Sequence, residues 1–489
     1  MTDETTPPTD PEQRAAPHAP SFERGDHAEL AEQLIDQLMS GDHCDAPVAF
    51  DLGDFWQYAT ARGVWETLPT ARLECMVQDF AGEFVHPGGE GKPYPLKVRR
   101  SDVVGTLECA KARPFAWGMG EGYFEDAPRG LAFSDGFLPV LEDDTGRPYL
   151  ADLTPHAPEN RARVGFDFPL ASSPTCPLFE GYLGSLWEGE PDGAERVRLL
   201  QQVTGVALLE YGTRYKRALM LYGEKGTGKS TFLDILLSLF PAGSVASVGP
   251  QHWGDFNLLA GLIGARINAV HELAPEHIKA QARAKEVMDG APLTIHEKYR
   301  NRVTFTPRAL HIFAANELPP VPGAHDSFWD RWMILELTRQ FRGTAGEVKD
   351  LGKNIAQHER AGIVRWALEG ARQVFEQDGY SVPESSRALL AQWGHEADSV
   401  ARFAHHELEP LPASAPHSHG LTDEELFADP VRGYMSWCAR KNLKSCSEPE
   451  FARRIKNAGL GKKQKSGSRR PWRVQWSTDD EPSHLSRVV

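Results

Sequence analysis

The segment Gly223–Ser230 constrains this chain most, because its sequence GEKGTGKS fits the pattern G-x-x-x-x-G-K-[ST] of a phosphate-binding loop. An apolar run, Ala218–Tyr222, precedes the segment, and an amphipathic run, Thr231–Phe240, follows it. This order predicts a buried strand, a tight loop and a helix. The alternative, a glycine-rich turn that fits the pattern by chance, does not account for both flanking elements.

The chemistry of a triphosphate explains the residues of this loop. Phosphate oxygens need several backbone N–H groups at close range, and glycines keep side chains away from the turn. The helix that follows adds the positive end of its dipole. We expect Lys229 to contact the β- and γ-phosphates and the Ser230 hydroxyl to bind Mg²⁺. The predicted ATP-binding residues are Gly223, Glu224, Lys225, Gly226, Thr227, Gly228, Lys229, Ser230 and Thr231.

Two later predicted strands end in polar residues. Arg266–Val270 is followed by Glu272, and Leu310–Ala314 by Asn316. In an open parallel sheet, ligands bind outside the carboxyl ends of the strands, so Glu272 is expected to face the triphosphate. There it would activate the attacking water or bind Mg²⁺. Asn316 is expected to hold the water or the γ-phosphate. A solvated glutamate and a turn-forming asparagine are the alternatives.

A fourth predicted strand, Trp332–Leu337, follows the pair Asp330-Arg331. Arg331 is a candidate catalytic residue that reaches the γ-phosphate of a neighbouring subunit, because a planar guanidinium matches phosphoryl charge. The spacing fits a surface ion pair with Asp330 equally well.

The length of 489 residues predicts about three domains, and alternating helices and short apolar strands predict an α/β fold for the central one. The expected parts are a disordered acidic and proline-rich tail (1–45), an α+β accessory domain with β-hairpins (46–175), a P-loop ATPase core (176–345), a helical extension (346–408), a linker (409–420), a winged-helix-like domain (421–478) and a tail (479–489).

The charge is distributed unevenly. The chain has a net charge of −15, yet twelve basic residues and two acidic residues lie between Arg440 and Arg473. A capping box at Thr422–Glu425 and a strand pair around Trp472–Trp476 predict short helices followed by a basic hairpin, as in a winged helix. The candidate DNA contacts there are Lys462, Lys463, Arg469 and Arg470.

The apolar runs are too short for a membrane-spanning helix, and the N-terminus lacks the basic and apolar regions of a secretory signal. Six cysteines occur without a Cys-x-x-Cys pair, so neither a disulfide framework nor a thiolate zinc site is predicted. We expect a cytoplasmic protein with no membrane partner.

Taken in order, the motifs resemble those of the superfamily 3 helicases of AAA+ type. The likeness is to the C-terminal halves of poxvirus, phage and plasmid primase-helicases. It rests on GEKGTGKS, INAVHEL, KEVMDGAPLTIHEKYRNRVTFTP, HIFAANELP and FWDRWMILEL. Weaker landmarks at 133–137, 153–158 and 176–183 extend the likeness over about residues 48–478.

This resemblance implies a ring, expected to be a homo-hexamer, that uses ATP and Mg²⁺ to move 3′ to 5′ along single-stranded DNA. It also implies a role at forked DNA in the replication of a phage, plasmid or integrated element, with a separate primase or polymerase as a partner. The third motif would form a hairpin in the central channel. Its basic residues Lys298, Arg300 and Arg302 would grip phosphates, and Tyr299 would pack against a base or sugar. A solvated basic turn is the alternative.

The sequence departs from this family in two ways. His271 precedes Glu272 where many members carry an acidic pair, which leaves open the group that contacts Mg²⁺ directly. Paired catalytic carboxylates of a primase are also missing, so primase activity is not expected. Two other functions stay open. One is an ATP-driven switch or loader that recruits a replication or defence protein without unwinding. The other is a small-molecule kinase, which the motif order disfavours.

Overall fold

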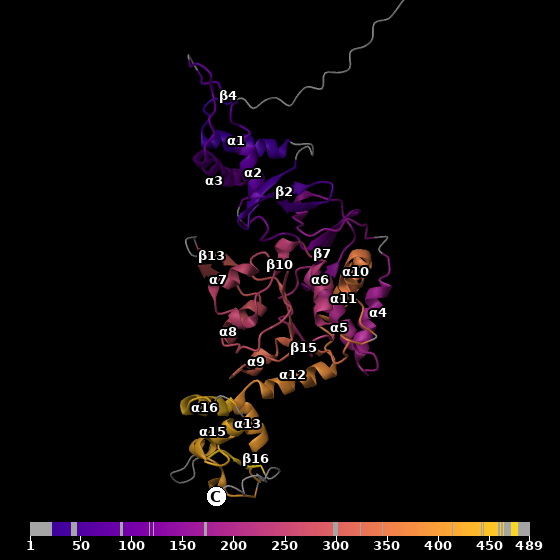
Figure 1. Cartoon of the computed structure of the whole chain (residues 1–489), viewed down its shortest axis with the longest axis vertical. Coiled ribbons are helices and arrows are strands. Elements are labelled where there is room, and N and C mark those ends of the chain that lie inside the picture. The colour runs from indigo at the N-terminus through magenta and orange to yellow at the C-terminus, as the bar shows by residue number, and fades with distance from the viewer. Residues whose placement is uncertain are drawn as a thin grey trace, which may run out of the picture. The chain divides into compact units, whose positions relative to one another are not determined.

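The computed structural model describes residues 22–40, 46–88, 91–116, 118–120, 122–170, 174–296, 302–322, 324–344, 346–412, 414–441, 443, 445–457, 460, 463 and 471–477. The chain divides into an N-terminal unit (residues 1–139 and 153–167) and a C-terminal unit (residues 140–152 and 168–489). Figure 1 labels their elements. Within the described ranges, every helix is either too short or too polar to cross a membrane.

The N-terminal unit combines small antiparallel sheets with helices. Its elements are α1 (His27–Met39), β1 (Val48–Asp51), β2 (Asp54–Ala59), β3 (Val64–Thr67), α2 (Thr70–Gln78), β4 (Phe84–Val85), β5 (Tyr94–Pro95), α3 (Arg100–Ala116), β6 (Gly130–Phe133), β7 (Gly136–Glu142) and η1 (Pro158–Asn160). Strand β8 (Pro148–Leu150) pairs with the end of β7 in the C-terminal unit. The antiparallel order β6-β7-β8 confirms the hairpins predicted in this region.

Helix α1 lies in the range that the sequence analysis assigned to a disordered tail, and for His27–Met39 that prediction is wrong. The Asp26 side chain caps the helix by accepting a hydrogen bond from the Glu29 backbone N–H. Leu30, Leu34 and Leu38 follow each other at four-residue spacing and are buried in the core of the unit. The apolar stripe is therefore visible in the sequence, directly after the proline-rich start.

A parallel five-stranded sheet forms the centre of the C-terminal unit. Its strands are β9 (Ala218–Tyr222), β10 (Val245–Ala246), β11 (Ile267–Val270), β14 (Leu310–Ala315) and β15 (Trp332–Glu336), in the spatial order β10-β11-β14-β9-β15. All neighbouring strands are parallel. Every residue of β14 is buried, as expected where helices cover both faces of a sheet. The four strands predicted from sequence are confirmed, with ends that differ by one residue.

Helices lie on both sides of this sheet; Figure 1 shows α5, α6 and α11 on one side and α7 and α8 on the other. The elements around the sheet are α4 (Pro177–Leu186), α5 (Gly193–Leu208), α6 (Lys229–Leu237), η2 (Ala242–Ser244), η3 (Pro250–His252), α7 (Phe256–Leu259), η4 (Ala260–Leu262), α8 (Gln281–Met288), β12 (Leu293–His296), β13 (Arg302–Phe305), α9 (Asp326–Trp329), α10 (Leu351–His358), α11 (Arg360–Gln377) and α12 (Glu384–Glu396). Strands β12 and β13 pair antiparallel, as predicted for the third motif.

A C-terminal module, residues 398–477, has its own apolar core. It contains α13 (Ser399–Glu407), β16 (Leu408–Pro410), η5 (His417–His419), α14 (Asp423–Ala428), α15 (Tyr434–Arg440), α16 (Glu448–Arg454), η6 (Ile455–Asn457) and β17 (Val474–Trp476). The predicted capping box is present at the start of α14. Strand β17 pairs with β16 rather than with a strand next to it in sequence, so the described strand pair joins the two ends of the module.

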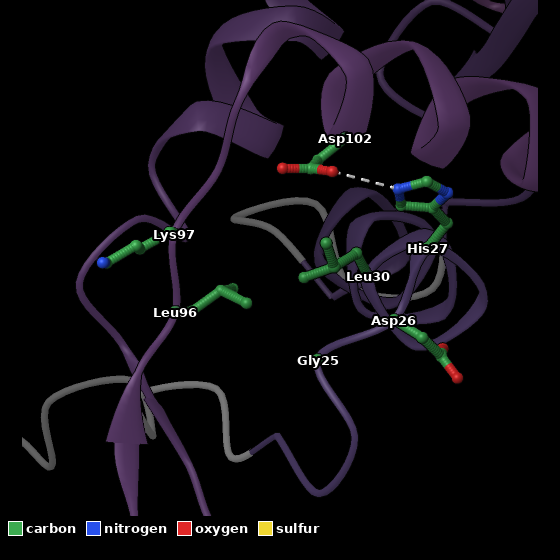
Figure 2. A pocket seen from close by; sticks show the side chains of 7 residues that line it. All are labelled: Gly25, Asp26, His27, Leu30, Leu96, Lys97 and Asp102. Atoms are coloured by element: carbon green, nitrogen blue, oxygen red, sulfur yellow. Dashed lines mark hydrogen bonds and ion pairs between the residues drawn. The ribbon is translucent and has the colours of Figure 1, made fainter.

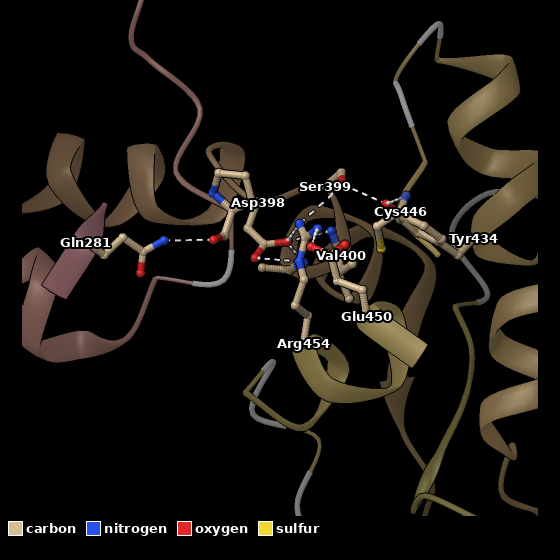
Figure 3. A network of polar contacts seen from close by, with 10 residues as sticks. Gln281, Asp398, Ser399, Val400, Tyr434, Cys446, Glu450 and Arg454 are labelled. Carbon is tan, nitrogen blue, oxygen red and sulfur yellow. Dashed lines mark hydrogen bonds and ion pairs between the residues drawn. The ribbon is translucent and has the colours of Figure 1, made fainter. Parts of the chain in front are cut away.

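A buried ion pair links the first helix of this module to α16 (Figure 3). The Arg454 guanidinium contacts both carboxylate oxygens of Asp398, with an Nε–Oδ2 distance of 3.2 Å. Asp398 also accepts a hydrogen bond from the Val400 backbone N–H at 2.8 Å. Nearby, the Ser399 and Tyr434 hydroxyls are 2.7 Å apart. The polar network therefore fixes the position of α13 against α15 and α16.

Candidate functional site

The loop between β9 and α6 has a shape that only glycine permits at several positions. Gly226 has φ +89°, and a Cβ atom there would lie 2.6 Å from Cβ of Arg342. Gly223 has φ +147°, and its Cβ would lie 2.2 Å from the Leu337 carbonyl oxygen. The segment after β15 therefore packs directly on the loop. The backbone N–H of Phe341 donates to the Gly226 carbonyl at 2.9 Å, which holds the two segments together.

Lys229 is the first residue of α6, and its side chain turns back into the loop. The ammonium donates to the carbonyl oxygens of Gly223 at 2.6 Å and Glu224 at 2.7 Å. It also donates to Oδ1 of Asn316 at 3.1 Å. Burial lowers the pKa of Lys229, and the carboxylate of Glu272 opposes this shift. A cation thus lies at the carboxyl end of β9, hydrogen-bonded to two backbone carbonyls and the Asn316 side chain and near the carboxylate of Glu272.

Glu272 and Asn316 meet this cation from the two adjacent strand ends. Nδ2 of Asn316 donates to Oε1 of Glu272 at 3.2 Å, while its Oδ1 accepts from Lys229. The exposed ammonium of Lys225 lies 3.4 Å from the same Glu272 oxygen. The structure therefore brings together Lys229, Glu272 and Asn316, three residues predicted from separate motifs. This happens because β9, β14 and β11 are adjacent parallel strands with their carboxyl ends at one edge.

These residues line a cavity of about 800 Å³. One wall is α4, where the buried Tyr182 hydroxyl donates to the Gly228 carbonyl at 2.9 Å. Burial raises the pKa of Tyr182, so the phenol stays protonated as a donor. Arg339 and Arg342, from the segment after β15, line another part. The sequence analysis missed Tyr182 and both arginines. The sequence signal for the arginines was that two basic residues follow the last predicted strand, Trp332–Leu337.

The residues at the cavity suit Mg²⁺ as a companion of phosphate. Ser230 and Glu272 supply a hydroxyl and a carboxylate, the hard oxygen donors that this ion prefers, and both are exposed. In the part of the chain that the structure describes, no group of three or more His, Cys, Asp and Glu side chains forms a metal cluster. Such a site matches an ion that takes its other ligands from phosphate and water.

Arg331 lies away from this cavity, at the amino end of β15. Its guanidinium is bidentate to Asp289, with Nε–Oδ1 and Nη2–Oδ2 distances of 2.6 Å each. The carboxylate raises the pKa of Arg331. The sequence left open a surface pair between Arg331 and Asp330. In the structure Arg331 pairs instead with Asp289, which caps the carboxyl end of α8.

Most predicted DNA contacts lie outside the described residues. These are Lys298, Tyr299, Arg300, Lys462, Arg469 and Arg470. Arg302 begins β13. Lys463 forms an ion pair with Asp423, and its ammonium lies 5.0 Å from the centre of the Trp472 ring. The DNA-binding role of these residues stays a prediction.

Comparison with known proteins gives distant matches. Residues 221–331 match a family described as "Family of unknown function (DUF5906)". No curated protein matches the chain. Three matching solved structures are of the NrS-1 C-terminal region. Two A-form apo structures are 15% and 14% identical, cover 78% and 92% of this chain and 78% and 99% of theirs, and have TM-scores of 0.45 and 0.46. A further apo structure is 13% identical, with coverages of 92% and 99% and a TM-score of 0.44.

Proposed function

We propose that this chain is an ATP-dependent DNA helicase of the superfamily 3, AAA+ type, with a P-loop at 223–230. The observation that carries this proposal is the meeting of Lys229, Glu272 and Asn316 beside the glycine-rich loop. The meeting point lies outside the carboxyl ends of parallel strands, and β9, which leads into the loop, has β14 on one side and β15 on the other. Ligands of open α/β sheets bind at such a point.

Each side chain at the cavity would have a separate role in ATP hydrolysis. The backbone N–H groups of the loop and the start of α6 would bind the phosphates. Lys229 would exchange the carbonyl oxygens of Gly223 and Glu224 for phosphate oxygens, so that its charge meets the β- and γ-phosphates. Glu272 would take a proton from the attacking water, with Asn316 holding the carboxylate and the water in place. Mg²⁺, bound by Ser230 and water-linked to Glu272, would neutralise phosphate charge.

The helicase would be a ring, expected to be a hexamer, in which Arg331 acts on ATP bound by the next subunit. Within one subunit this residue lies at the opposite strand ends from Lys229, so a role in hydrolysis requires a neighbour. The channel hairpin β12–β13 would follow single-stranded DNA, and the basic C-terminal module, acting as a winged helix, would hold forked DNA. A separate primase or polymerase would complete the replication machinery of a phage, plasmid or integrated element.

A strand-displacement assay on forked DNA tests this proposal, run with ATP, without ATP and with the Lys229→Ala variant. We expect unwinding only for the wild-type protein with ATP, and particles that contain several subunits by mass photometry. Hydrolysis of ATP without strand displacement would instead favour the switch or loader. Absence of both hydrolysis and ATP binding in the folded protein would refute the site itself.

A further inference from the structure

A small hairpin in the N-terminal unit presents two aromatic rings to solvent. Strands β4 and β5 pair antiparallel, with Phe84 opposite Pro95 and Val85 opposite Tyr94. Phe84 is 51% exposed and Tyr94 is 46% exposed. Exposed rings of this size are costly to leave in water. Directly opposite residues of an antiparallel pair share a face, so Tyr94 lies on the face of Val85 and Phe84 lies on the other face of the hairpin.

The hairpin is anchored at its base, so the exposed rings are held on a fixed support. Val85 is fully buried and forms a parallel bridge with Phe22. The backbone N–H of Leu96 donates to the Glu83 carbonyl at 2.7 Å. The Tyr94 hydroxyl donates to the Arg24 carbonyl at 3.3 Å. A ring held in this way loses little conformational entropy when a flat ligand stacks on it.

The chain continues from the hairpin into a run of cations. Residues 92–100 read KPYPLKVRR, with four basic residues and no acidic one, in a protein of net charge −15. Lys92, Lys97, Arg99 and Arg100 are all exposed. None of these four side chains forms an ion pair with any other residue that the structure describes. Arg99 acts electrostatically on Asp102, so the charges of Lys92, Lys97 and Arg100 are the more available to an anion.

The direction of the side chains separates the core of this region from its surface. Figure 2 shows Leu96 directed towards Leu30 of α1 and Lys97 directed the opposite way, away from the helices. Lys97 lines a cavity of about 220 Å³ together with His27 and Asp102, whose Nε2 and Oδ1 atoms are 3.3 Å apart. The alternation places Leu96 inside and leaves Lys97 on the outer side of the segment.

We propose that hairpin β4–β5 and residues 92–100 form a binding surface for single-stranded DNA. The exposed cations would contact the phosphates, and bases would stack on the ring of Phe84 on one face of the hairpin and on that of Tyr94 on the other, which is the combination that non-specific single-strand binders use. A lipid surface fits less well, since Val85 and Leu96 are buried and the described hairpin offers no aliphatic side chain for insertion. This surface does not depend on the ATP site.

The test measures binding of the full-length protein to a fluorescent oligothymidylate without nucleotide. We expect the Phe84→Ala, Tyr94→Ala double variant to bind about tenfold more weakly, because base stacking is lost. In the Lys97→Gln, Arg99→Gln, Arg100→Gln triple variant, the slope of log affinity against log salt should fall by about two, at roughly 0.7 per phosphate contact. The Phe115→Ala variant is the matched control. Phe115 is 52% exposed in the same unit, and lies about 22 Å along α3 from Arg100.

A second measurement locates the contact directly, because other parts of the chain are also expected to bind DNA. Bromodeoxyuridine-substituted strands are cross-linked to the wild-type protein, and the labelled peptides are mapped. We expect labelled peptides that contain Phe84 or Tyr94. Unchanged affinity and salt slope in folded variants, or cross-links confined to other segments, would overturn the proposal. The proposal would also be overturned if the folded variants lost binding to anionic vesicles but bound DNA as the wild-type protein does. Results with Lys229→Ala, in which only the ATP site changes, should match wild type.

Discussion

Arg331 and Asp289 form a bidentate ion pair across 42 residues of sequence, with two nitrogen–oxygen distances of 2.6 Å. The pair lies at the amino end of β15, whereas Lys229 follows the carboxyl end of the parallel neighbour β9. Five strand residues span about 17 Å, so Arg331 does not reach the proposed ATP site of its own subunit. To act on a neighbour, the guanidinium has to leave Asp289.

Mixing subunits tests this trans role of Arg331. Neither Arg331→Ala nor Lys229→Ala protein should hydrolyse ATP alone, but a mixture of equal amounts should regain about a quarter of wild-type turnover. Half of the loops in the mixture keep Lys229, and half of those loops have a neighbour that keeps Arg331. Phosphate release measures the recovery. Arg387→Ala, at a surface arginine paired with Glu384, should keep wild-type turnover as a control, and absence of recovery in the mixture would exclude the trans role.

Replacing Lys229 separates ATP turnover from folding. We expect Lys229→Ala to lower ATP hydrolysis at least 100-fold, because the phosphate charge loses its only buried cation from the loop. Stability should fall by no more than about 1–2 kcal/mol, since Lys229 itself lines the cavity and water can take the place of its ammonium. Phosphate release and thermal unfolding by circular dichroism measure the two effects. Wild-type turnover by the folded variant would contradict the assignment.

Replacing Glu272 separates the chemical step from ATP binding. The amide of Glu272→Gln cannot take a proton from water but keeps an oxygen to accept from Asn316. We therefore expect hydrolysis to fall about 10²–10⁴-fold while ATP affinity stays within a few-fold of wild type. Equilibrium binding of a fluorescent ATP analogue provides the second measurement. Glu276→Gln is the matched control, because it is the same substitution at an exposed residue that does not line the cavity.

A buried histidine makes stability depend on pH. His311, on β14, is buried, and burial lowers its pKa to about 4 from an ordinary value near 6.5. Between these two values the unfolded chain binds a proton that the folded chain does not. The free energy of unfolding should therefore fall as pH decreases from 6.5 to 4, by about 3 kcal/mol from this residue.

Chemical unfolding at several pH values checks this prediction. The His311→Leu variant should show a flatter dependence over the same window. At pH 8 it should lose about 1 kcal/mol, because the Asn268 side chain, 3.1 Å from Nδ1 of His311, loses one partner. His277→Gln, at an exposed position, should keep the wild-type dependence. Equal slopes for wild type and His311→Leu would show that this histidine does not titrate as proposed.

The parts of the site that could be predicted from the sequence are those set by the order of the buried strands in the sheet. Apolar runs such as Leu310–Ala315 read as buried strands, and the common edge of parallel strands brought Asn316 to Lys229. Contacts made by side chains from distant segments carried no such signal. Tyr182 reaches Gly228 across 46 residues, and its helix reads as an ordinary apolar helix.

The C-terminal module shows the same limit for backbone pairing. A hairpin was predicted because strands close in sequence usually pair, but Val474 of β17 pairs with Pro410 of β16. The range 409–420 carries prolines and serines, which are typical of linkers. This composition gave no sign of the short strand β16 at its start. The apolar residues of α13, which pack into the module, are also compatible with a continued helical extension.

The buried pair Arg454–Asp398 offers a last prediction, on the stability of this module. Arg454→Met leaves the carboxylate of Asp398 buried without the guanidinium of Arg454, while the backbone N–H groups of Val400 and Ala401 still donate to it. We expect the variant to lose about 3 kcal/mol, at the lower end for a broken buried pair because those two donors remain. Adding Asp398→Asn removes the uncompensated charge while keeping an oxygen to cap α13, so the double variant should be more stable than Arg454→Met alone. Urea unfolding followed by tryptophan fluorescence measures both. Arg453→Met, at the exposed neighbouring position, should change stability by less than about 0.5 kcal/mol. A double variant no more stable than Arg454→Met would mean that Arg454 stabilises the module through packing of its side chain rather than through its charge.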